Sequence, residues 1–384
     1  MVYSLEELFD LQMGKTPSRN NFNYWNTNDN KWVSISDLSQ SGRYIHETKE
    51  YISDDAIAES GIKVIPANTV IMSFKLSIGK VAITKEEMYS NEAIMAFHDK
   101  HTTELLPEYI YYLFRNKDWS IGTNKAVMGK TLNKATLSQM KISVCSIQKQ
   151  REIVSVLNKV SEIIDNMKDQ IFALDELIKS RFVEMFGDPV NNPFEWKKVS
   201  LSELAEIKIG PFGSLLHKDD YIEDGHPLVN PSHIKDGKII TDNKLTISDE
   251  KFDEMAAYHL KIGDVVIGRR GEMGRCAVVT EDGLLCGTGS LLIRSKGEIT
   301  ADYIQKIISF PSFKKIIEDM AVGQTMPNLN VPIVSNFKII KPPIGVQHKY
   351  YSFVHQIDKL KLTAKESLKK LEIMQKALMQ QYFC

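Results

Sequence analysis

The chain has few cysteines and no segment of the kind that a membrane span requires. Only four of its 384 residues are cysteine and no two are spaced as C-x-x-C, so neither a zinc ribbon nor a disulfide framework is indicated. No apolar run approaches the roughly 18 residues of a membrane span. The N-terminus has neither the basic nor the apolar region of a signal peptide. We therefore expect a protein of the reducing cytoplasm without a membrane partner.

The chain also has almost no net charge. Its 48 basic and 49 acidic residues give a formal charge of -1. This balance argues against a uniformly basic nucleic-acid coat but is compatible with a local basic face. The composition, 43% hydrophobic and 25% charged, is ordinary for a globular protein. At this length the chain can form two or three domains, each with its own core.

The sequence repeats itself at an offset of about 195 residues. The matching segments run from one end to the other: residues 4–8 with 200–204, 78–82 with 273–277, Leu132-Asn133 with Leu329-Asn330, Ile147 and Gln150 with Ile344 and Gln347, and Phe186 with Phe383. A period this long indicates a duplicated domain with its connector rather than a solenoid. Two similar units suit a ligand with two similar halves.

Each repeat begins with about 145 residues of mixed pattern. Residues 64–72 and 261–268 are strand-like and are interrupted by turn residues. Short helices are expected at 106–114 and 301–310. This part of each repeat is therefore predicted to be mixed α/β.

Each repeat ends in a long amphipathic segment. Residues 148–186 contain no glycine or proline, and their apolar residues recur at steps of three and four until Gly187 and Pro189 end the pattern. The second copy spans 346–383. About 39 residues at roughly 1.5 Å per residue give a helix of about 58 Å.

A long helix with one apolar stripe needs a partner. The partner could be a second chain in a homodimeric coiled coil, but pairing within one chain has the higher effective concentration. The predicted fold is α+β (mixed α/β): two similar globular domains separated by a long antiparallel two-helix coiled coil, related by a pseudo-twofold. Its parts are a domain at 1–145, a helix at 146–187, a linker with the second domain at 188–343, and a helix at 344–384.

The fragments that resemble catalytic motifs are incomplete. The two G-K-T segments at 14–16 and 129–131 lack the upstream glycine of a phosphate loop. Residues 192–194 lack the second proline of an amino-methyltransferase motif, and no glycine-rich cofactor loop accompanies them. The pair His98 and His101 has no third metal ligand nearby. We expect no catalytic residue, no metal and no cofactor.

Two polar loops recur in both copies. Residues 268–275 place three arginines among three glycines, and 74–80 supply lysines at the same point of the first copy. Residues 323–330 and 129–133 are rich in Asn, Gln and Lys. Arg and Lys bind phosphates or guanine, and Asn and Gln bind adenine, although each residue is also common in solvated turns. The candidate DNA-binding residues are Lys75, Lys80, Lys130, Asn133, Arg269, Arg270, Arg275, Gln324, Asn328 and Asn330.

With these motifs the chain resembles the specificity subunits of type I restriction–modification systems over essentially its whole length. The segments that carry the resemblance are 209–214 (IGPFGS), 268–271 (GRRG), 287–290 (GTGS), 323–330 (GQTMPNLN) and 181–189 (RFVEMFGDP). The first copy departs from the pattern, because it has Gly14-Lys15-Thr16-Pro17-Ser18 at the position of Gly210-Pro211-Phe212-Gly213-Ser214.

The resemblance implies a non-catalytic subunit with two target recognition domains, each recognising one half of an asymmetric bipartite site in double-stranded DNA. It implies that the helix pair sets the spacing and docks two adenine-methylating modification subunits, and that restriction subunits join the complex. Two alternatives are the recognition part of a fused methyltransferase–nuclease and a coiled-coil protein-interaction scaffold. The first is disfavoured because the sequence starts directly in a recognition unit.

Overall fold

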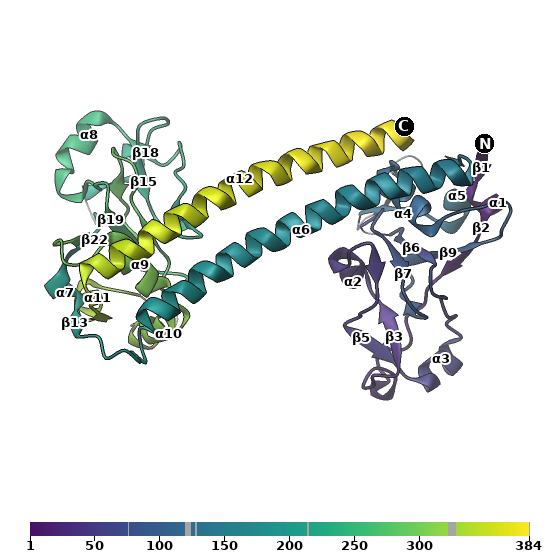
Figure 1. The fold of residues 1–384 in the computed structure, drawn as a ribbon, viewed down its shortest axis with the longest axis horizontal. Coiled ribbons are helices and arrows are strands. Elements are labelled where there is room, and N and C mark those ends of the chain that lie inside the picture. The colour runs from purple at the N-terminus through teal and green to yellow at the C-terminus, as the bar shows by residue number, and fades with distance from the viewer. Residues whose placement is uncertain (76, 120–123, 127–128, 213–214, 322–327, 384) are drawn as a thin grey trace. The chain divides into compact units, whose positions relative to one another are not determined.

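The computed structural model describes residues 1–75, 77–119, 124–126, 129–212, 215–321 and 328–383 (Figure 1). The chain forms two compact units. Unit 1 consists of residues 1–169 and 365–384, and unit 2 of residues 170–364. Each unit combines short strands, short helices and parts of the two long helices. The predicted mixed fold class is therefore confirmed.

Unit 1 is built on a five-stranded sheet. Its strands, in spatial order, are β2 (Phe9–Met13), β9 (Ile94–Asp99), β6 (Val70–Ser73), β7 (Val81–Thr84) and β4 (Tyr44–Ile45). All residues of β6 and β7 are buried, because both faces of these strands are covered. The helix α4 (Pro107–Asn116) packs against β6 and β7. Proline at its first turn and Val, Ile and Met in the strands agree with the local preferences of helix starts and strands.

A smaller lobe of unit 1 has its own core. Its elements are β3 (Asn30–Val33), β5 (Glu50–Ile52), β8 (Tyr89–Ser90), α2 (Ile35–Gln40), α3 (Asp54–Ser60) and the 3-10 turn η1 (Phe22–Tyr24). Tyr24, Trp32 and Ile52 are buried together between the strands and α3. Serine caps begin both helices, since the hydroxyl groups of Ser34 and Ser53 accept hydrogen bonds from backbone N–H groups of the first turn.

Unit 2 repeats the main sheet with four strands. Their order is β14 (Ala205–Ile209), β22 (Ser290–Ser295), β19 (Asp264–Gly268) and β20 (Cys276–Val278), and α9 (Ala301–Ser309) packs on β19 and β20 (Figure 1). The remaining elements are β15 (His226–Val229), β18 (Thr246–Ile247), β21 (Leu285–Cys286), β16 (Ile234–Lys235), β17 (Lys238–Ile239), α8 (Asp249–Glu254), α10 (Pro311–Met320) and the 3-10 turns η3 (Lys218–Asp220), η4 (Pro231–His233) and η5 (Ala256–Tyr258).

The start of each repeat folds in the same way. In unit 1, β1 (Val2–Ser4) pairs with β12 (Lys141–Ser143) before α1 (Leu5–Leu8), and α5 (Lys134–Ser138) precedes β12. In unit 2, β13 (Lys198–Ser200) pairs with β23 (Lys338–Ile340) before α7 (Leu201–Leu204), and α11 (Val331–Ser335) precedes β23. Unit 1 also has the hairpin of β10 (Asn124–Ala126) and β11 (Gly129–Thr131). The internal repeat is thus a repeat of strand pairing.

The two long helices are α6 (Ile147–Phe186) and α12 (Ile344–Phe383), each of 40 residues. Within unit 1, the Nε2 of Gln375 donates to the Oγ of Ser161 at 2.9 Å, and Lys168 lies 4.0 Å from Glu372. Within unit 2, the hydroxyl group of Tyr350 donates to the backbone oxygen of Ile178 at 3.2 Å. Also within unit 2, the Nζ of Lys361 donates to the carboxylate of Asp175. In both units, therefore, the α12 partner has a lower number where the α6 residue has a higher one. The predicted antiparallel pairing is therefore confirmed.

One buried glutamine joins each long helix to its unit. The Oε1 of Gln150 accepts from the backbone N–H of Leu106 at 3.0 Å, just before α4. The Oε1 of Gln347 accepts from the backbone N–H of Thr300 at 2.9 Å, just before α9. Both side chains are fully buried, so their amide groups need these partners. The repeated glutamines therefore align the first turn of each long helix with the first turn of a sheet-covering helix.

In the part of the chain that the structure describes, no helix is both long and apolar enough to cross a membrane. The same residues contain no group of three or more His, Cys, Asp or Glu side chains able to hold a metal ion. The two histidines that the sequence offered as candidate metal ligands contact polar side chains instead. The Nε2 of His98 lies 3.1 Å from the Oε1 of Gln12, and the Nδ1 of His101 lies 3.4 Å from the Oδ2 of Asp99. These histidines thus have ordinary polar partners.

Candidate nucleic-acid interface

Two glycine-containing segments of unit 2 meet around one turn. A Cβ on Gly210 would lie 2.0 Å from the backbone oxygen of Gly287, and one on Gly287 would lie 2.3 Å from the Oδ1 of Asn230. A Cβ on Gly289 would lie 2.9 Å from Pro231. These approaches leave no room for a side chain, so the glycines are required by packing. They bring the segments 209–212 and 287–290 against Asn230 and Pro231.

Arg269 connects two of the predicted loops. Its Nε donates to the backbone oxygen of Leu329 at 3.0 Å, and the backbone N–H of Leu329 donates to the backbone oxygen of Arg269 at 2.9 Å. The backbone N–H of Arg269 donates to the backbone oxygen of Gly289 at 2.9 Å. Burial, followed by the nearby charge of Arg270, lowers the pKa of the Arg269 guanidinium. Arg269 therefore has a positioning role, and of its guanidinium only the two Nη groups lack a hydrogen bond to described residues.

The other two arginines of this loop differ from each other. Arg275 points back into unit 2, because its Nη1 donates to Pro231 at 3.2 Å and its Nη2 lies 2.9 Å from the Oε2 of Glu272. Arg270 is exposed and has no ion pair or hydrogen bond among the described residues. Of the three arginines, Arg270 is thus the one whose side chain is entirely available to a ligand.

The repeated asparagines cap helices. The Oδ1 of Asn133 accepts from the N–H of Thr136 at 2.7 Å, at the start of α5, and the Oδ1 of Asn330 accepts from the N–H of Ile333 at 2.9 Å, at the start of α11. Asparagine is a preferred N-cap residue, which explains its repetition without a ligand. The amide NH₂ groups of both asparagines donate no hydrogen bond to a described residue. The Oδ1 of Asn328 is buried and has no hydrogen-bond partner among the described residues.

In unit 1 the corresponding turn lies between β6 and β7. Lys80 is exposed, and its backbone N–H donates to the Oγ of Ser73 at 3.1 Å. The Nζ of Lys75 lies 5.2 Å from the centre of the Phe74 ring. Gln324 and the side chain of Lys130 lie outside the described residues. Lys75 and Lys80 therefore both belong to the segment between β6 and β7, as Arg269 and Arg270 belong to the segment between β19 and β20 in unit 2.

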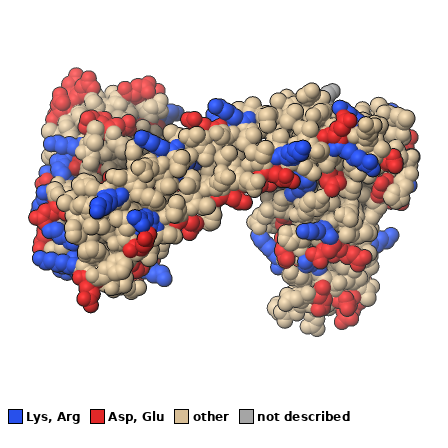
Figure 2. All heavy atoms as spheres, viewed as in Figure 1, with Lys and Arg blue, Asp and Glu red and all other residues tan. Residues whose placement is uncertain are grey.

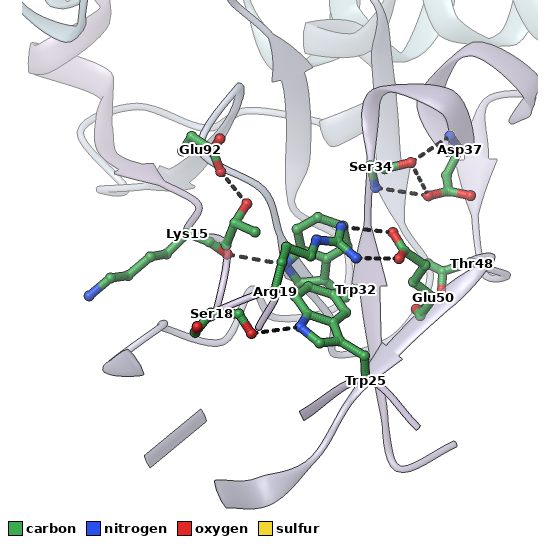
Figure 3. Close-up of polar contacts among 11 residues, drawn as sticks. Lys15, Ser18, Arg19, Trp25, Trp32, Ser34, Asp37, Thr48, Glu50 and Glu92 are labelled. Atoms are coloured by element: carbon green, nitrogen blue, oxygen red, sulfur yellow. Dashed lines mark hydrogen bonds and ion pairs between the residues drawn. The ribbon is translucent and has the colours of Figure 1, made fainter. Parts of the chain in front are cut away.

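The segment that begins at Gly14 is fixed by two tryptophans (Figure 3). The Nε1 of Trp32 donates to the backbone oxygen of Lys15 at 3.1 Å, and the Nε1 of Trp25 donates to that of Ser18 at 3.1 Å. The hydroxyl group of Thr16 donates to the carboxylate of Glu92. The Trp32 side chain is buried, and a buried indole N–H needs such an acceptor. The segment of the first copy that departs from the family pattern is thus still ordered by its own unit.

Sequence reasoning missed Arg19, which lies at the end of this segment. Its guanidinium lies 3.6 Å from the ring centre of Trp25 and 4.9 Å from that of Trp32. It also forms a bidentate ion pair with Glu50, in which Nη2 and Oε2 are 3.0 Å apart (Figure 3). Stacking and a bidentate carboxylate are the contacts that arginine forms best. The signal in the sequence was an arginine close to two tryptophans, without a defined spacing.

Charges of both signs are interspersed over the face of each unit that Figure 2 shows. The near-neutral composition therefore does not conceal a field of a single sign on that face.

The family model of the type I restriction modification DNA specificity domain matches residues 1–175 and again residues 193–373. These two matches include both glycine-containing segments and both candidate loops. The chain belongs to this family. It is a specificity subunit, the non-catalytic DNA-recognition component of a type I restriction–modification system, and its general role is to recognise a DNA site.

Known specificity subunits resemble the chain over much of its length. The type I restriction enzyme MjaIX specificity subunit of Methanocaldococcus jannaschii is 25% identical over 387 residues, which cover 93% of this chain and 86% of the relative. The EcoR124I/EcoR124II specificity subunit of Escherichia coli is 26% identical over 173 residues, 43% of this chain and 42% of the relative. Both similarities agree with the family match in description, and the first also agrees with it in extent.

Solved structures share the fold. The specificity subunit from M. genitalium has a TM-score of 0.57 at 15% identity and covers all of this chain, with 96% of its own length matched. A chain from a study of complex assembly and conformational transition of the type I system has a TM-score of 0.63 at 16% identity, with 100% and 97% covered. At these identities the likeness establishes the architecture.

Proposed function

We propose that this specificity subunit recognises an asymmetric bipartite site in duplex DNA, one half through each repeat. One observation carries the proposal: the same backbone loops present different side chains. The N–H of Leu132 donates to the backbone oxygen of Phe74 at 3.0 Å, as that of Leu329 does to Arg269 at 2.9 Å. The following residues are Lys75 in one copy and Arg270 in the other. One scaffold with two sets of exposed residues suits two different half-sites.

The exposed basic groups would contact DNA directly. Arginine binds the guanine edge bidentately or a phosphate, and lysine binds phosphates as a point charge. Arg270, Lys75 and Lys80 fit this role, together with Lys130 and Gln324 from the sequence pattern. The free amide NH₂ groups of Asn133 and Asn330 could donate to base edges, as could Asn328. Arg269 and Arg275 would position the loop that carries Arg270.

The long helices would bind the modification subunits. Their large exposed apolar side chains are Val156, Ile163, Ile373 and Met374 in unit 1, and Phe172, Leu177, Val183, Ile344, Leu360 and Leu362 in unit 2. Phe172 is 66% exposed, which is costly unless a partner covers it. Because the repeat supplies such residues twice, we propose two modification subunits, which methylate adenine, and a complex that restriction subunits join.

The helix pair would also set the gap between the half-sites. Forty residues at about 1.5 Å each span about 60 Å. In this proposal the recognition domains are residues 1–145 and 188–343, and the helices at 146–187 and 344–384 are the connectors.

The test is to express the chain with its modification subunit and to sequence the methylated adenines of the host DNA. We expect one split motif with a fixed gap. Exchanging residues 1–145 for the corresponding domain of another specificity subunit should change one half of the motif only. A contiguous motif, or a change in both halves, would refute the assignment of one half-site to each repeat.

A further inference from the structure

Unit 2 contains a basic cleft of about 750 Å³, and Arg275 is the one residue of its lining that the sequence pattern and the proposed function also use. Its walls come from the hairpin turn at 235–237, the loop 272–276, the end of α9, the start of α10 and one side chain of α6. The hairpin turn lies close to α9, because a Cβ on Gly237 would be 2.9 Å from the Nε2 of Gln305. All of these elements belong to unit 2.

The cleft contains more cations than anions. Five basic side chains line it, Lys179, Lys235, Arg275, Lys306 and Lys314, against the two carboxylates of Asp236 and Glu272. Glu272 is shared, because it lies 2.9 Å from both Arg275 and Lys314. Its charge is therefore already balanced, and the cleft as a whole has an excess of positive charge.

Two of these lysines are unsatisfied. Lys306 and Lys235 have no ion pair or side-chain hydrogen bond among the described residues. Lys306 is half-buried on α9, and burial, followed by the nearby charge of Lys179, lowers the pKa of its ammonium group. A half-buried ammonium beside another cation is stabilised when an anion enters the cleft.

We propose that this cleft binds a phosphate group, and that the occupant is a backbone phosphate of the DNA bound by unit 2. Phosphate oxygens accept several charge-assisted hydrogen bonds at once, which matches cations that converge from different elements. The cleft shares residues 272–276 with the loop of Arg270, so a duplex on that loop would have its backbone nearby. The DNA source rests on the proposed function, whereas the phosphate chemistry rests on the cleft alone.

Unit 1 has no equivalent cleft residue at this position. Tyr112 is the unit 1 counterpart of Lys306, because both this pair and the pair Tyr109 and Tyr303 are about 194 residues apart. The hydroxyl group of Tyr112 donates to the Oδ1 of Asn158 at 2.9 Å and lies 3.2 Å from the Oγ of Ser161. The position is therefore closed by hydrogen bonds in unit 1 and is open and cationic in unit 2.

The experiment compares the full-length chain with the double variant Lys235→Gln/Lys306→Gln. Duplex DNA of random sequence is titrated by fluorescence anisotropy between about 50 and 200 mM salt. Each lost phosphate contact lowers the salt slope by about 0.9, so we expect a loss of up to about two units and roughly tenfold weaker binding at low salt. A parallel titration with inorganic phosphate, followed by phosphorus NMR, should show binding by the wild-type chain and none by the double variant.

The matched control is Lys244→Gln/Lys349→Gln, which removes the same charge from two exposed lysines outside the cleft. It should keep the wild-type salt slope. Lys306→Arg retains the charge and should also retain phosphate binding, and circular dichroism melting confirms that each variant is folded.

The outcomes separate the two sources of phosphate. If the double variant loses both inorganic phosphate binding and part of the salt slope of DNA binding, the occupant is a DNA phosphate. Loss of phosphate binding with an unchanged DNA slope overturns the DNA occupant, and a double variant that matches the wild type in both overturns the site. If the wild-type chain failed to bind duplex at all, the proposed function would fail, while the inorganic phosphate titration would still decide the cleft.

Discussion

The two units share their buried packing contacts and hydrogen bonds, and they differ in their exposed side chains. Gly14 and Gly210 approach backbone equally closely, and Gln150 and Gln347 join the same elements. In contrast, Tyr112 in unit 1 is hydrogen bonded, whereas Lys306 in unit 2 lies in the basic cleft. After duplication, residues that satisfy buried backbone groups cannot change without a large cost, while exposed residues can. The exposed residues that differ between the two units are thus the ones that would give each unit a different ligand.

The segments that begin at Gly14 and Gly210 are also held by buried contacts, but the contacts differ between the two units. Unit 2 orders its segment by close packing of Gly210 and Gly287, and unit 1 orders its segment by the indole groups of Trp25 and Trp32. Both solutions fix the backbone after the first glycine. They leave different side chains at the surface, among them Arg19 in unit 1.

The largest effect is expected at the glycines of closest approach. Gly14→Ala and Gly210→Ala each place a Cβ within about 2.2 Å of a backbone oxygen, so each should lower the free energy of unfolding by about 3 kcal/mol or more. Gly42→Ala is the control, because nothing lies within 4 Å of its Cβ. Urea unfolding of the three variants measures the difference. Tolerance of one glycine variant alone would show that the units are not equivalent here.

The next effect concerns the buried amides. Gln150→Leu and Gln347→Leu leave two or three backbone groups without partners, at a cost of about 2–4 kcal/mol. The exposed Gln381→Leu should change stability by less than about 0.5 kcal/mol. Thermal melting followed by circular dichroism provides the comparison. A small loss in Gln150→Leu would mean that water replaces the amide in unit 1.

A third prediction separates the arginines of one loop. Arg270→Ala should leave stability unchanged and lower the salt slope of DNA binding by about 0.9, because the side chain is free. Arg275→Ala should instead cost about 1 kcal/mol of stability, since it removes the hydrogen bond to Pro231 and a partner of Glu272. Anisotropy titrations and urea unfolding of both variants test this division. Equal effects of the two on both measurements would contradict it.

The smallest effect is a pH dependence confined to unit 2. Hydrogen bonds from Lys314 and then Arg275 lower the pKa of the Glu272 carboxyl. A lowered folded-state pKa stabilises the protein above the unfolded pKa of about 4.5, and this contribution is lost as pH falls through the folded value. Because the carboxylate is 56% exposed, the effect should stay below about 1 kcal/mol.

The measurement is urea unfolding of the wild type and Glu272→Gln at neutral and acidic pH. The two proteins should differ at neutral pH and converge in acid. A difference that grows in acid would reverse the assigned sign. Ser77, the counterpart in unit 1, has no such carboxyl group, so Ser77→Ala should show no change of this kind.

Much of the local structure followed from the sequence alone. The spacing of apolar residues and the absence of Gly and Pro predicted the long helices to within two residues of α6 and α12. The short helices α4 and α9 were also expected where they lie, because capping residues and helical periodicity are local properties. The offset between the copies predicted a duplicated domain, since similar sequences form similar elements, and the strand pairing that the copies share came from the structure.

Only the tertiary structure decided the roles of the polar residues. Arg275 is turned inward by Pro231, which is 44 residues away, and Arg269 bonds to Leu329, which is 60 residues away. Arg19 is stacked by tryptophans of another element, and the basic cleft joins side chains from the hairpin, α6, α9 and α10. The sequence pattern fixes periodicity and capping because those interactions join near neighbours. Which side chain is free, and which is held, depends on contacts between segments that only folding brings together.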